Sequence, residues 1–464
     1  MREYYITIDD ALRAGLRPEI KTPKNSPVLS ECLGYRVGRL GLEGIRGLTN
    51  PLPDTVALLY SWPFPQFLRG EKYRILITRD DFLVEDRVYS LDETYTTATL
   101  VFSIEGLIYG QGTLMELADF GEYAFMTNGV IMLYWDPTLA AWDKKTSITT
   151  IPMMRTICNF KGQMVGGCVL SAWADCDEKS IVWSNIGSAD FTLGRRNESG
   201  YRRDLFGGEV YHVRRLGDSV IVYSSKGITR MYPVSSPSAT FGFKELLNKG
   251  VLNRGAVGGD LNEHAFVDED YVVWKIDNDG LKRVGYQGYM DNLIMDDVIV
   301  TYDSNEGDFY FSDGTKTYLL SPKGLTEHPG YCSAVWYDGL LYGLPETDLE
   351  TTTMPYIKSE IIDMGYRGQK TIFTIEVDIE GTEVAVEYRN RNKDPFKRTP
   401  FTPVNDQGVA TVIISGVEFR IIVKSLEFEP LTEGPDRITV RWKMTDLRGL
   451  RGIYAAPPRG QSAN

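Results

Sequence analysis

Tyr123-Ala-Phe-Met-Thr-Asn-Gly129-Val-Ile-Met-Leu-Tyr-Trp135 is the stretch that decides the fold class of this 464-residue chain. It contains two short apolar segments, separated by a polar turn that ends in glycine, and the second segment closes on two aromatic residues. Asn-Gly at the turn tolerates the positive φ angles of a tight hairpin, and aromatic and β-branched residues suit a pleated strand. The stretch therefore predicts a β-hairpin.

The same unit recurs along the middle of the chain. Longer copies lie at 220–232 and 309–319, each with glycine in its turn, and shorter copies lie at 157–165, 265–274 and 335–342. Hairpins that repeat every few tens of residues are typical of propellers, solenoids and sandwiches. Because the intervals are uneven and no Gly-His…Trp-Asp series occurs, we expect an irregular β-propeller over residues 55–345. Two packed sandwiches are the alternative.

The N-terminal segment, residues 1–54, differs in composition from this middle region. A short helical signal at 8–15 has an acidic first turn and a stopping glycine. Three prolines follow between residues 18 and 27, and proline does not fit the interior of a helix or a central strand. We expect an extended N-terminal arm after the helix, which becomes ordered by contact with a neighbouring subunit or ring.

The C-terminal part has a different sequence pattern from the middle region. Residues 351–448 contain runs of alternating apolar and polar residues, such as 371–381 and 383–388, which predict antiparallel strands of a separate β-sandwich. Residues 449–464 have the composition of a disordered tail. Within the middle region, residues 241–250 are expected to form a short helix. The predicted fold class is therefore all-β, with an arm, an irregular propeller and a C-terminal sandwich.

Composition and charge exclude several functions. The chain has 63 acidic residues against 50 Lys and Arg, a formal charge of −13, which argues against a protein that grips nucleic acid by neutralising phosphates. No stretch approaches the roughly 18 consecutive apolar residues of a membrane helix, and the N-terminus lacks the order of a signal peptide. We therefore expect synthesis in a cytoplasm and no stable membrane anchor.

The residues that usually carry catalysis or metal binding are sparse. The three histidines, His212, His264 and His328, lie in different hairpin regions, and no HExxH, GxSxG or P-loop pattern accompanies them. The five cysteines have no CxxC spacing and are expected to be free, mostly buried thiols: Cys32, Cys158, Cys168, Cys176 and Cys332. We expect no catalytic residues, no metal and no cofactor, and hence no enzyme.

Acidic clusters at 268–270, 277–280 and 303–308 suggest calcium or glycosidase sites. The last begins like an EF-hand loop but has Gly307 and Gly314 where ligands belong, which excludes that motif. The cluster at 277–280 fits a tight turn equally well, because Asp and Asn side chains accept hydrogen bonds from their own backbone. A carboxylate pair for glycoside hydrolysis stays open, since distance in sequence does not give distance in space.

Three arginine pairs fall within about twenty residues of one another. A solvated or salt-bridging loop explains them better than a phosphate site. We expect these residues to lie at interfaces with other subunits or partner rings, paired with acids: Arg195, Arg196, Arg202, Arg203, Arg214 and Arg215.

A family resemblance rests on two neighbouring stretches. Phe160-Lys-Gly-Gln-Met-Val-Gly166 is followed by Ile181-Val-Trp-Ser-Asn-Ile-Gly-Ser-Ala-Asp-Phe-Thr192, a hairpin that precedes Trp-Ser-x-x-Gly-x-x-x-Phe. With the hairpins at 220–232 and 265–274, this order resembles the tail nozzle proteins of short-tailed bacteriophages, also called packaged-DNA stabilisation or head-closure tail accessory proteins. The likeness covers about three quarters of the chain in style and order, and residues 1–54 depart from it.

The resemblance implies a structural virion protein of the phage tail. Such a protein forms a hexameric ring below the portal and adaptor proteins, extends the DNA channel, retains the packaged genome and takes part in its ejection. Genomic DNA would pass through the lumen without sequence-specific binding, and tail fibre or needle proteins would be further partners. The alternatives are a ligand- or glycan-binding propeller, with or without hydrolase activity, and a receptor-binding component of another phage tail or baseplate.

Overall fold

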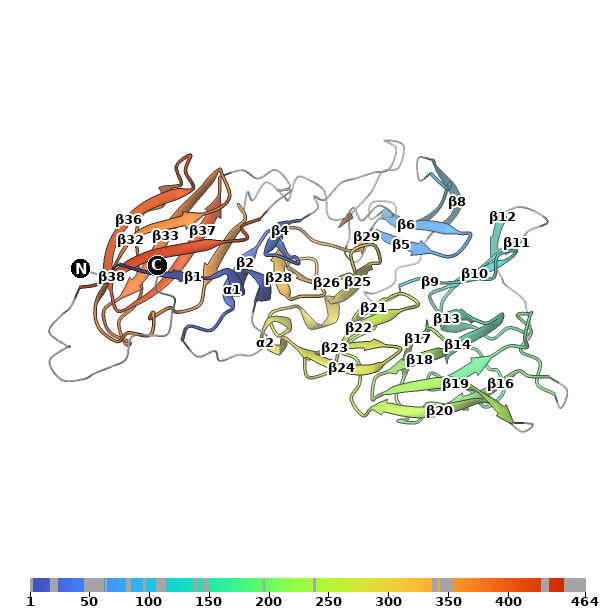
Figure 1. Ribbon diagram of the computed structural model, residues 1–464. Coiled ribbons are helices and arrows are strands. Elements are labelled where there is room, and N and C mark those ends of the chain that lie inside the picture. Colours follow the sequence, from blue (N-terminus) through green and yellow to red (C-terminus); the bar gives the residue numbers. More distant parts are fainter. Residues whose placement is uncertain are drawn as a thin grey trace. The chain divides into compact units, whose positions relative to one another are not determined.

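The computed structural model describes most of the chain. The described residues are 3–16, 24–45, 62, 65–80, 85–94, 97–105, 114–136, 138, 141–144, 150–194, 197–236, 239–335, 341–342, 354–426 and 434–445. They belong to two compact units (Figure 1). Unit 1 comprises Met1–Gly47, Thr317–Gly330 and Glu346–Asn464, and unit 2 comprises Leu48–Lys316 and Tyr331–Pro345.

Strands dominate the described residues of both units, which confirms the all-β prediction. The helical elements found there are short: α1 (Asp9–Ala14), α2 (Gln287–Met290) and the 3-10 helix η1 (Met295–Asp297). The expected helix at 8–15 is confirmed by α1. None of the helices in these ranges has the length and apolar character needed to cross a membrane.

Within its described residues, unit 2 contains five antiparallel sheets of four strands, each formed by consecutive strands. The first sheet consists of β5 (Gln66–Arg69), β6 (Arg74–Asp80), β7 (Glu85–Leu91) and β8 (Ala98–Glu105), and the second of β9 (Glu116–Asp119), β10 (Ala124–Thr127), β11 (Met132–Asp136) and β12 (Ala141–Lys144). The third consists of β13 (Met154–Phe160), β14 (Gln163–Val169), β15 (Ser180–Trp183) and β16 (Gly200–Arg203), and the fourth of β17 (Val210–Leu216), β18 (Ser219–Ser224), β19 (Ile228–Ser236) and β20 (Ala239–Leu247). The fifth consists of β21 (Val257–Gly259), β22 (Glu263–Val267), β23 (Val273–Asp277) and β24 (Gly280–Gly285). Two further pairs follow: β25 (Ile299–Asp303) with β26 (Asp308–Ser312), and β29 (Ala334–Val335) with β30 (Leu341–Tyr342).

The first strands of these sheets lie beside one another. β9 contacts β5 and β13, β13 contacts β17, β21 contacts β25, and β29 contacts both β25 and β5. Between β17 and β22, Nε2 of His264 donates a hydrogen bond to the carbonyl oxygen of Arg215 at 3.2 Å. The first strands β21, β25, β29, β5, β9, β13 and β17 thus form one series of neighbours.

Apolar layers fill the spaces between successive sheets. Alternate residues of one strand enter different layers, as period-two geometry requires: Ala124 and Met126 pack toward β5–β8, whereas Phe125 packs toward β13–β16. On β15, Ile181 and Trp183 face the layer shared with β17–β20, and Val182 faces the opposite side. Each of these sheets is therefore covered on both faces, which explains their high content of buried apolar residues.

Unit 1 contains two larger assemblies of strands. In one sheet the order is β1 (Tyr4–Thr7), β38 (Ile438–Met444), β32 (Lys370–Val377) and β36 (Val409–Gly416). In the other it is β27 (Thr317–Leu320), β28 (Leu325–His328), β2 (Leu29–Leu33), β31 (Tyr356–Ser359), β37 (Glu418–Ser425), β33 (Thr382–Arg389) and β34 (Lys397–Arg398), with β35 (Thr402–Pro403) also paired to β33. A small hairpin adds β3 (Tyr35–Val37) and β4 (Leu42–Gly44).

The N-terminal segment differs from the expected arm. Tyr4 of β1 pairs with Trp442 of β38, and β2 lies between β31 and β28, antiparallel to the first and parallel to the second. The described parts of residues 1–45 thus belong to unit 1, where they form β1 to β4 and α1. The prolines do not prevent this, because β2 begins only after Pro27. Residues 17–23, with two of the three prolines, lie outside the described residues.

The helix expected at 241–250 is wrong, because these residues form most of β20, whose Phe241 and Phe243 pack against Trp183. The ladder with β19 supplies backbone hydrogen bonds that outweigh the local helix signal. The alternating strands expected within 351–448 are present as β31–β38. The expected tail, 449–464, lies outside the described residues.

Candidate functional site

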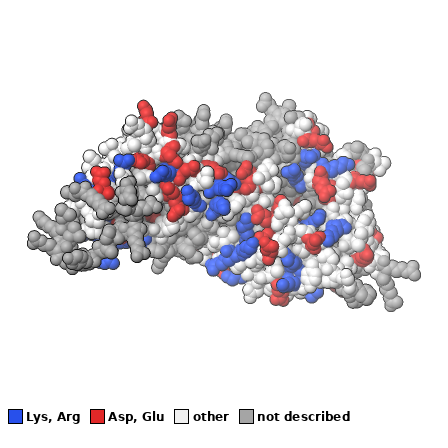
Figure 2. All heavy atoms as spheres, viewed as in Figure 1, with Lys and Arg blue, Asp and Glu red and all other residues white. Residues whose placement is uncertain are grey.

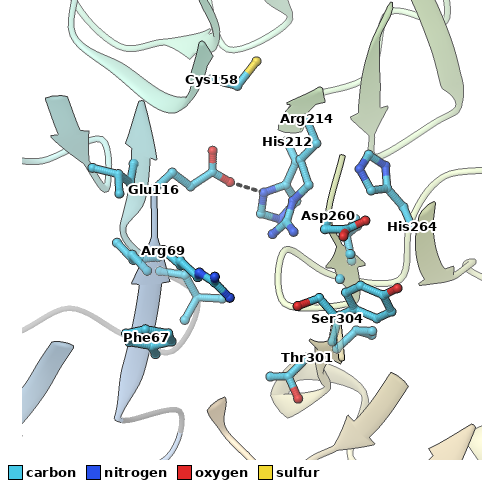
Figure 3. A pocket seen from close by; sticks show the side chains of 18 of the residues that line it. Phe67, Arg69, Glu116, Cys158, His212, Arg214, Asp260, His264, Thr301 and Ser304 are labelled. Carbon is cyan, nitrogen blue, oxygen red and sulfur yellow. Dashed lines mark hydrogen bonds and ion pairs between the residues drawn. The ribbon is translucent and has the colours of Figure 1, made fainter. Parts of the chain in front are cut away.

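A cavity of about 710 Å³ lies in unit 2, where its first strands meet. Its lining comes from β5, β9, β13, β17, β21, β25 and β29 and from the turns beside them. Figure 3 shows Arg69 of β5, Glu116 of β9 and Arg214 of β17 directed toward its interior, with Asp260 and His264 across from Glu116. Charged side chains from separate sheets are thus brought together.

The pair Glu116 and His212 dominates one wall of the cavity. Glu116 is the first residue of β9, and His212 follows a β-bulge at the start of β17. Nδ1 of His212 lies within hydrogen-bonding distance of Oε1 of Glu116, and Nε2 lies within hydrogen-bonding distance of the carbonyl oxygen of Arg254. The imidazole is only 4% exposed. A bulge re-aims a side chain relative to its strand, which fits this placement.

Opposing effects act on this pair. Burial outweighs the Glu116 charge and hydrogen bond, so the pKa of His212 lies below its ordinary value. Burial also acts to raise the pKa of Glu116, but His212, the nearby Arg214 and a hydrogen bond from Thr156 together hold it below its usual range. Glu116 is therefore ionised at neutral pH, and its charge is stabilised from two neighbouring sheets.

Thr156 extends the contact to β13. Its Oγ1 donates to Oε2 of Glu116 at 2.5 Å and accepts from the backbone N–H of Val213 at 2.9 Å. The backbone N–H of Ile157 also donates to Oε2 of Glu116, at 3.1 Å. One carboxylate thus joins β9, β13 and β17. We interpret Glu116 as a structural centre of the wall, since its oxygens are occupied by protein donors.

His264 lies in a second buried position of the lining. The hydroxyl of Tyr223 donates to its Nδ1 at 2.8 Å, while its Nε2 donates to Arg215. Burial lowers the pKa of His264 to about 3. The ring is therefore neutral at physiological pH, with its proton on Nε2.

The other acids of the lining mostly build turns. Asp119 accepts backbone N–H bonds from Lys72, Tyr73 and Gly121. Asp260 accepts from the backbone of Asn262, at 2.8 Å, and of Glu263. The contacts to Gly121, Asn262 and Glu263 match the capping geometry of Asx turns, whereas those to Lys72 and Tyr73 join Asp119 to the neighbouring sheet.

The acidic clusters behave in the same way. Oδ1 of Asp277 accepts from the backbone of Asp279 and Gly280, which confirms the turn interpretation of residues 277–280. Asp268 accepts from the backbone of Asp270 and Val272 and from the Trp274 indole. Across the described residues, no group of three His, Cys, Asp or Glu side chains is arranged to hold a metal ion.

Cys158 is the residue of the lining with nucleophilic potential. Burial, followed by the charge of Glu116, raises the pKa of its thiol above the ordinary value. A nucleophilic cysteine needs the opposite shift, toward the thiolate. All five cysteines are free, and four of them are buried, as expected; Cys176 is half-buried. The cavity therefore offers binding groups in place of an activated thiol.

The structure separates the predicted arginine pairs. Arg202 and Arg203 are exposed on β16, the last strand of its sheet, where Arg203 pairs with Asp177 and Arg202 stacks on Phe243 at 4.8 Å. Arg214 and Arg215 are half-buried on β17 and line the cavity. Arg195 and Arg196 lie outside the described residues. The two described pairs therefore do not form one surface.

Sequence reasoning missed the cavity residues as a group. Glu116 and His212 are 96 positions apart and belong to no motif. The one available signal is positional, since each lies at the beginning of the first strand of a sheet. That signal becomes readable only when the order of the sheets is known.

On the face drawn in Figure 2, Lys and Arg side chains are interspersed with Asp and Glu. Ion pairs in unit 2 include Lys275–Glu263 and Lys282–Asp277, each at 2.9 Å. No family model matches the chain, and no curated protein is significantly similar to it in sequence. Its own residues and their geometry must therefore carry a functional inference.

Proposed function

We propose that this chain is a structural subunit of a short-tailed bacteriophage tail. Six copies would form the nozzle ring below the portal and adaptor, extend the DNA channel and take part in genome retention and ejection. The observation that carries the proposal is architectural: serial four-stranded sheets surround one cavity in unit 2, and a separate all-β unit 1 is formed by both ends of the chain. A ring subunit needs rigid β-domains of this kind.

Unit 2 is, in this proposal, an irregular β-propeller. Its sheets are meanders formed by consecutive strands, and their first strands follow one another around the cavity. Both features are typical of propeller blades. Apolar layers between successive sheets provide the packing that such an arrangement requires.

The residues behind the family resemblance support an architectural likeness. Trp183 donates its indole N–H to the carbonyl oxygen of Glu198 at 2.9 Å, and Phe191 is fully buried. Gly187 has a φ of +74° and donates its backbone N–H to Gly162 at 2.9 Å. The Trp-Ser-x-x-Gly-x-x-x-Phe segment thus closes a loop onto the β13–β14 hairpin. In this proposal, the residues of the segment have a structural role in a blade, and the function comes from the assembled ring.

Charge is compatible with a DNA conduit. The formal charge of −13 disfavours adsorption of DNA, so a genome would slide past such a surface. Exposed Arg202 and Arg203 on the outer strand β16 stay our candidates for contact with a neighbouring subunit. Each already has a partner in its own chain, so an interface would extend these contacts.

Co-assembly tests this proposal. The full chain would be mixed with the portal and adaptor proteins encoded in the same genome, and the product separated by sedimentation and viewed by electron microscopy. We expect the chain to co-sediment and to add a ring below the adaptor. A chain that stays separate and monomeric in the presence of assembled portal and adaptor would contradict the proposal.

A further inference from the structure

Unit 1 carries a strongly basic hairpin, although the chain as a whole is acidic. Residues 389–398, which comprise the end of β33, its turn and β34, contain five Lys and Arg residues and one acid. Four of these cations are exposed and form no ion pair with any residue that the structure describes: Arg391, Lys393, Lys397 and Arg398. This basic hairpin therefore presents positive charge without a counter-charge from the described part of its own chain.

Aromatic rings brace the basic hairpin from below. The guanidinium groups of Arg389 and Arg420 lie 4.5 Å and 4.6 Å from the centre of the Phe396 ring. The guanidinium of Arg398 lies 5.5 Å from the Phe401 ring. Such cation–π contacts are attractive and restrict the side chains that make them. The exposed cations therefore project from a fixed support, which lowers the entropy that a binding partner must remove.

Unit 2 carries the opposite charge over residues 284–315. This stretch contains seven acidic residues and no Lys or Arg. Asp291 and Asp296 are exposed, and neither forms an ion pair with a described residue. Between them lie two exposed apolar side chains, Ile294 at 49% and Met295 at 44%. Protein interfaces combine apolar contact with complementary charge, and this short acidic segment offers both.

A second copy of this chain suits the basic hairpin better than a nucleic acid does. A phosphate backbone would approach a chain whose formal charge is −13, so much of the protein would repel it. The acidic segment 291–297 of another copy matches the hairpin in charge, and its apolar pair can contact Pro395, which is exposed in the hairpin turn. Because the two surfaces differ, the contact is head-to-tail, and such contacts can close into rings.

We propose that the basic hairpin 389–398 of one copy docks on the acidic segment 291–297 of the next copy. Arg391 and Lys393 pair with Asp291 and Asp296 across this contact. The inference rests on the proposed ring and names the surfaces that join its subunits. Exposed charges are screened over about 8–10 Å at physiological salt, so the contact should weaken as salt rises.

Charge reversal in two separate full-length variants tests the inference. The first variant carries Arg391→Glu and Lys393→Glu, and the second carries Asp291→Lys and Asp296→Lys. All four side chains are exposed and form no hydrogen bond or ion pair with a described residue, so both variants should fold. Neither variant alone should form the six-chain ring in native mass spectrometry, at a concentration where the unaltered chain forms it, because like charges then meet at every contact.

An equimolar mixture of the two variants should restore the ring. The acidic hairpin of the first variant meets the basic segment of the second, and the other two surfaces are unaltered, so an alternating ring has opposite charges at every contact. The matched control is Lys226→Glu with Lys323→Glu, which reverses two exposed lysines outside both surfaces and should leave ring formation unchanged.

The outcomes separate this inference from the proposed function. If the unaltered chain forms its ring, a ring formed by either variant alone, or a mixture that fails to form one, would overturn the inference and leave the proposed function standing. Single chains of the unaltered protein at every concentration would overturn both. Binding of double-stranded DNA at physiological salt that is lost in the first variant would assign the hairpin to a nucleic acid and overturn the inference.

Discussion

The two units of this chain are built from contacts of very different range. In unit 2, each four-stranded sheet is a run of consecutive strands, and polar side chains such as Glu116 and His264 connect one sheet to the next. In unit 1, Tyr4 pairs with Trp442, and β2 is enclosed by strands more than 290 residues later in the chain. Local pairing thus builds unit 2, whereas unit 1 cannot form until both ends of the chain are available.

Their buried charges differ as well. In unit 1, Glu418 on β37 is 1% exposed and pairs with Arg389 and with Lys24 of the N-terminal segment. Lys24 keeps 39% of its side chain exposed, so water still reaches one partner. In unit 2, both Glu116 and His212 are largely buried. A buried carboxylate thus tethers a distant segment in unit 1, whereas in unit 2 it joins neighbouring sheets.

Removal of residues 1–33 should have the largest effect. It deletes β1, α1 and β2, and so exposes the edges of β28 and β31 that β2 covers. We expect β31, β37 and β38 to lose protection in hydrogen exchange measured by mass spectrometry, while β9, β13 and β17 keep theirs. A chain that lacks only residues 1–3 is the control. Full protection of β31 and β38 in the truncated chain would show that unit 1 does not need its N-terminal strands.

Removal of single buried carboxylates should have the next largest effect. Glu116→Ala leaves His212, Thr156 and the Ile157 N–H without their acceptor, and should cost about 1–3 kcal/mol of unfolding free energy for each buried group left unpaired. Glu418→Ala should cost less, because Lys24 can turn to solvent.

Hydrogen exchange would report each loss in its own unit. Glu383→Ala is the control, since its contact with half-exposed Lys424 spans 3.5 Å and should contribute less than about 1 kcal/mol. Equal losses for the Glu116 and Glu418 variants would remove the contrast drawn between the two units.

Protonation of His264 should make the stability of unit 2 depend on pH, with a smaller effect than the changes above. Its pKa is lowered to about 3 in the folded chain from an ordinary 6.5, so between these values the unfolded chain binds the proton and the folded chain does not. The stabilisation is therefore fully present above pH 6.5 and is lost as pH falls toward 3. We expect His264→Gln, which retains both a donor and an acceptor, to reduce the decline in stability between pH 6.5 and 5. Parallel curves for both proteins in urea unfolding would contradict this.

The same contrast of range explains what could be predicted from the sequence. The hairpin at 123–135 was predictable because both strands and the Asn128-Gly129 turn lie within thirteen residues, and β10 and β11 form there. The pairing of β1 with β38 was not predictable, since nothing local to Tyr4 indicates Trp442. The cavity was missed for the same reason, because its residues come from strands of separate sheets. The helix expected at 241–250 failed because pairing with β19 outweighed a local preference.

The native mass of the purified chain tests the claim of a closed ring most directly. Native mass spectrometry at micromolar concentration, over a range of ammonium acetate concentrations, would separate single chains of 52.3 kDa from assemblies. The ring account predicts one discrete species at six times the chain mass, without a ladder of intermediates, because a closed cyclic assembly leaves no free interface. Single chains at every salt and protein concentration, or an open-ended series of masses, would contradict it.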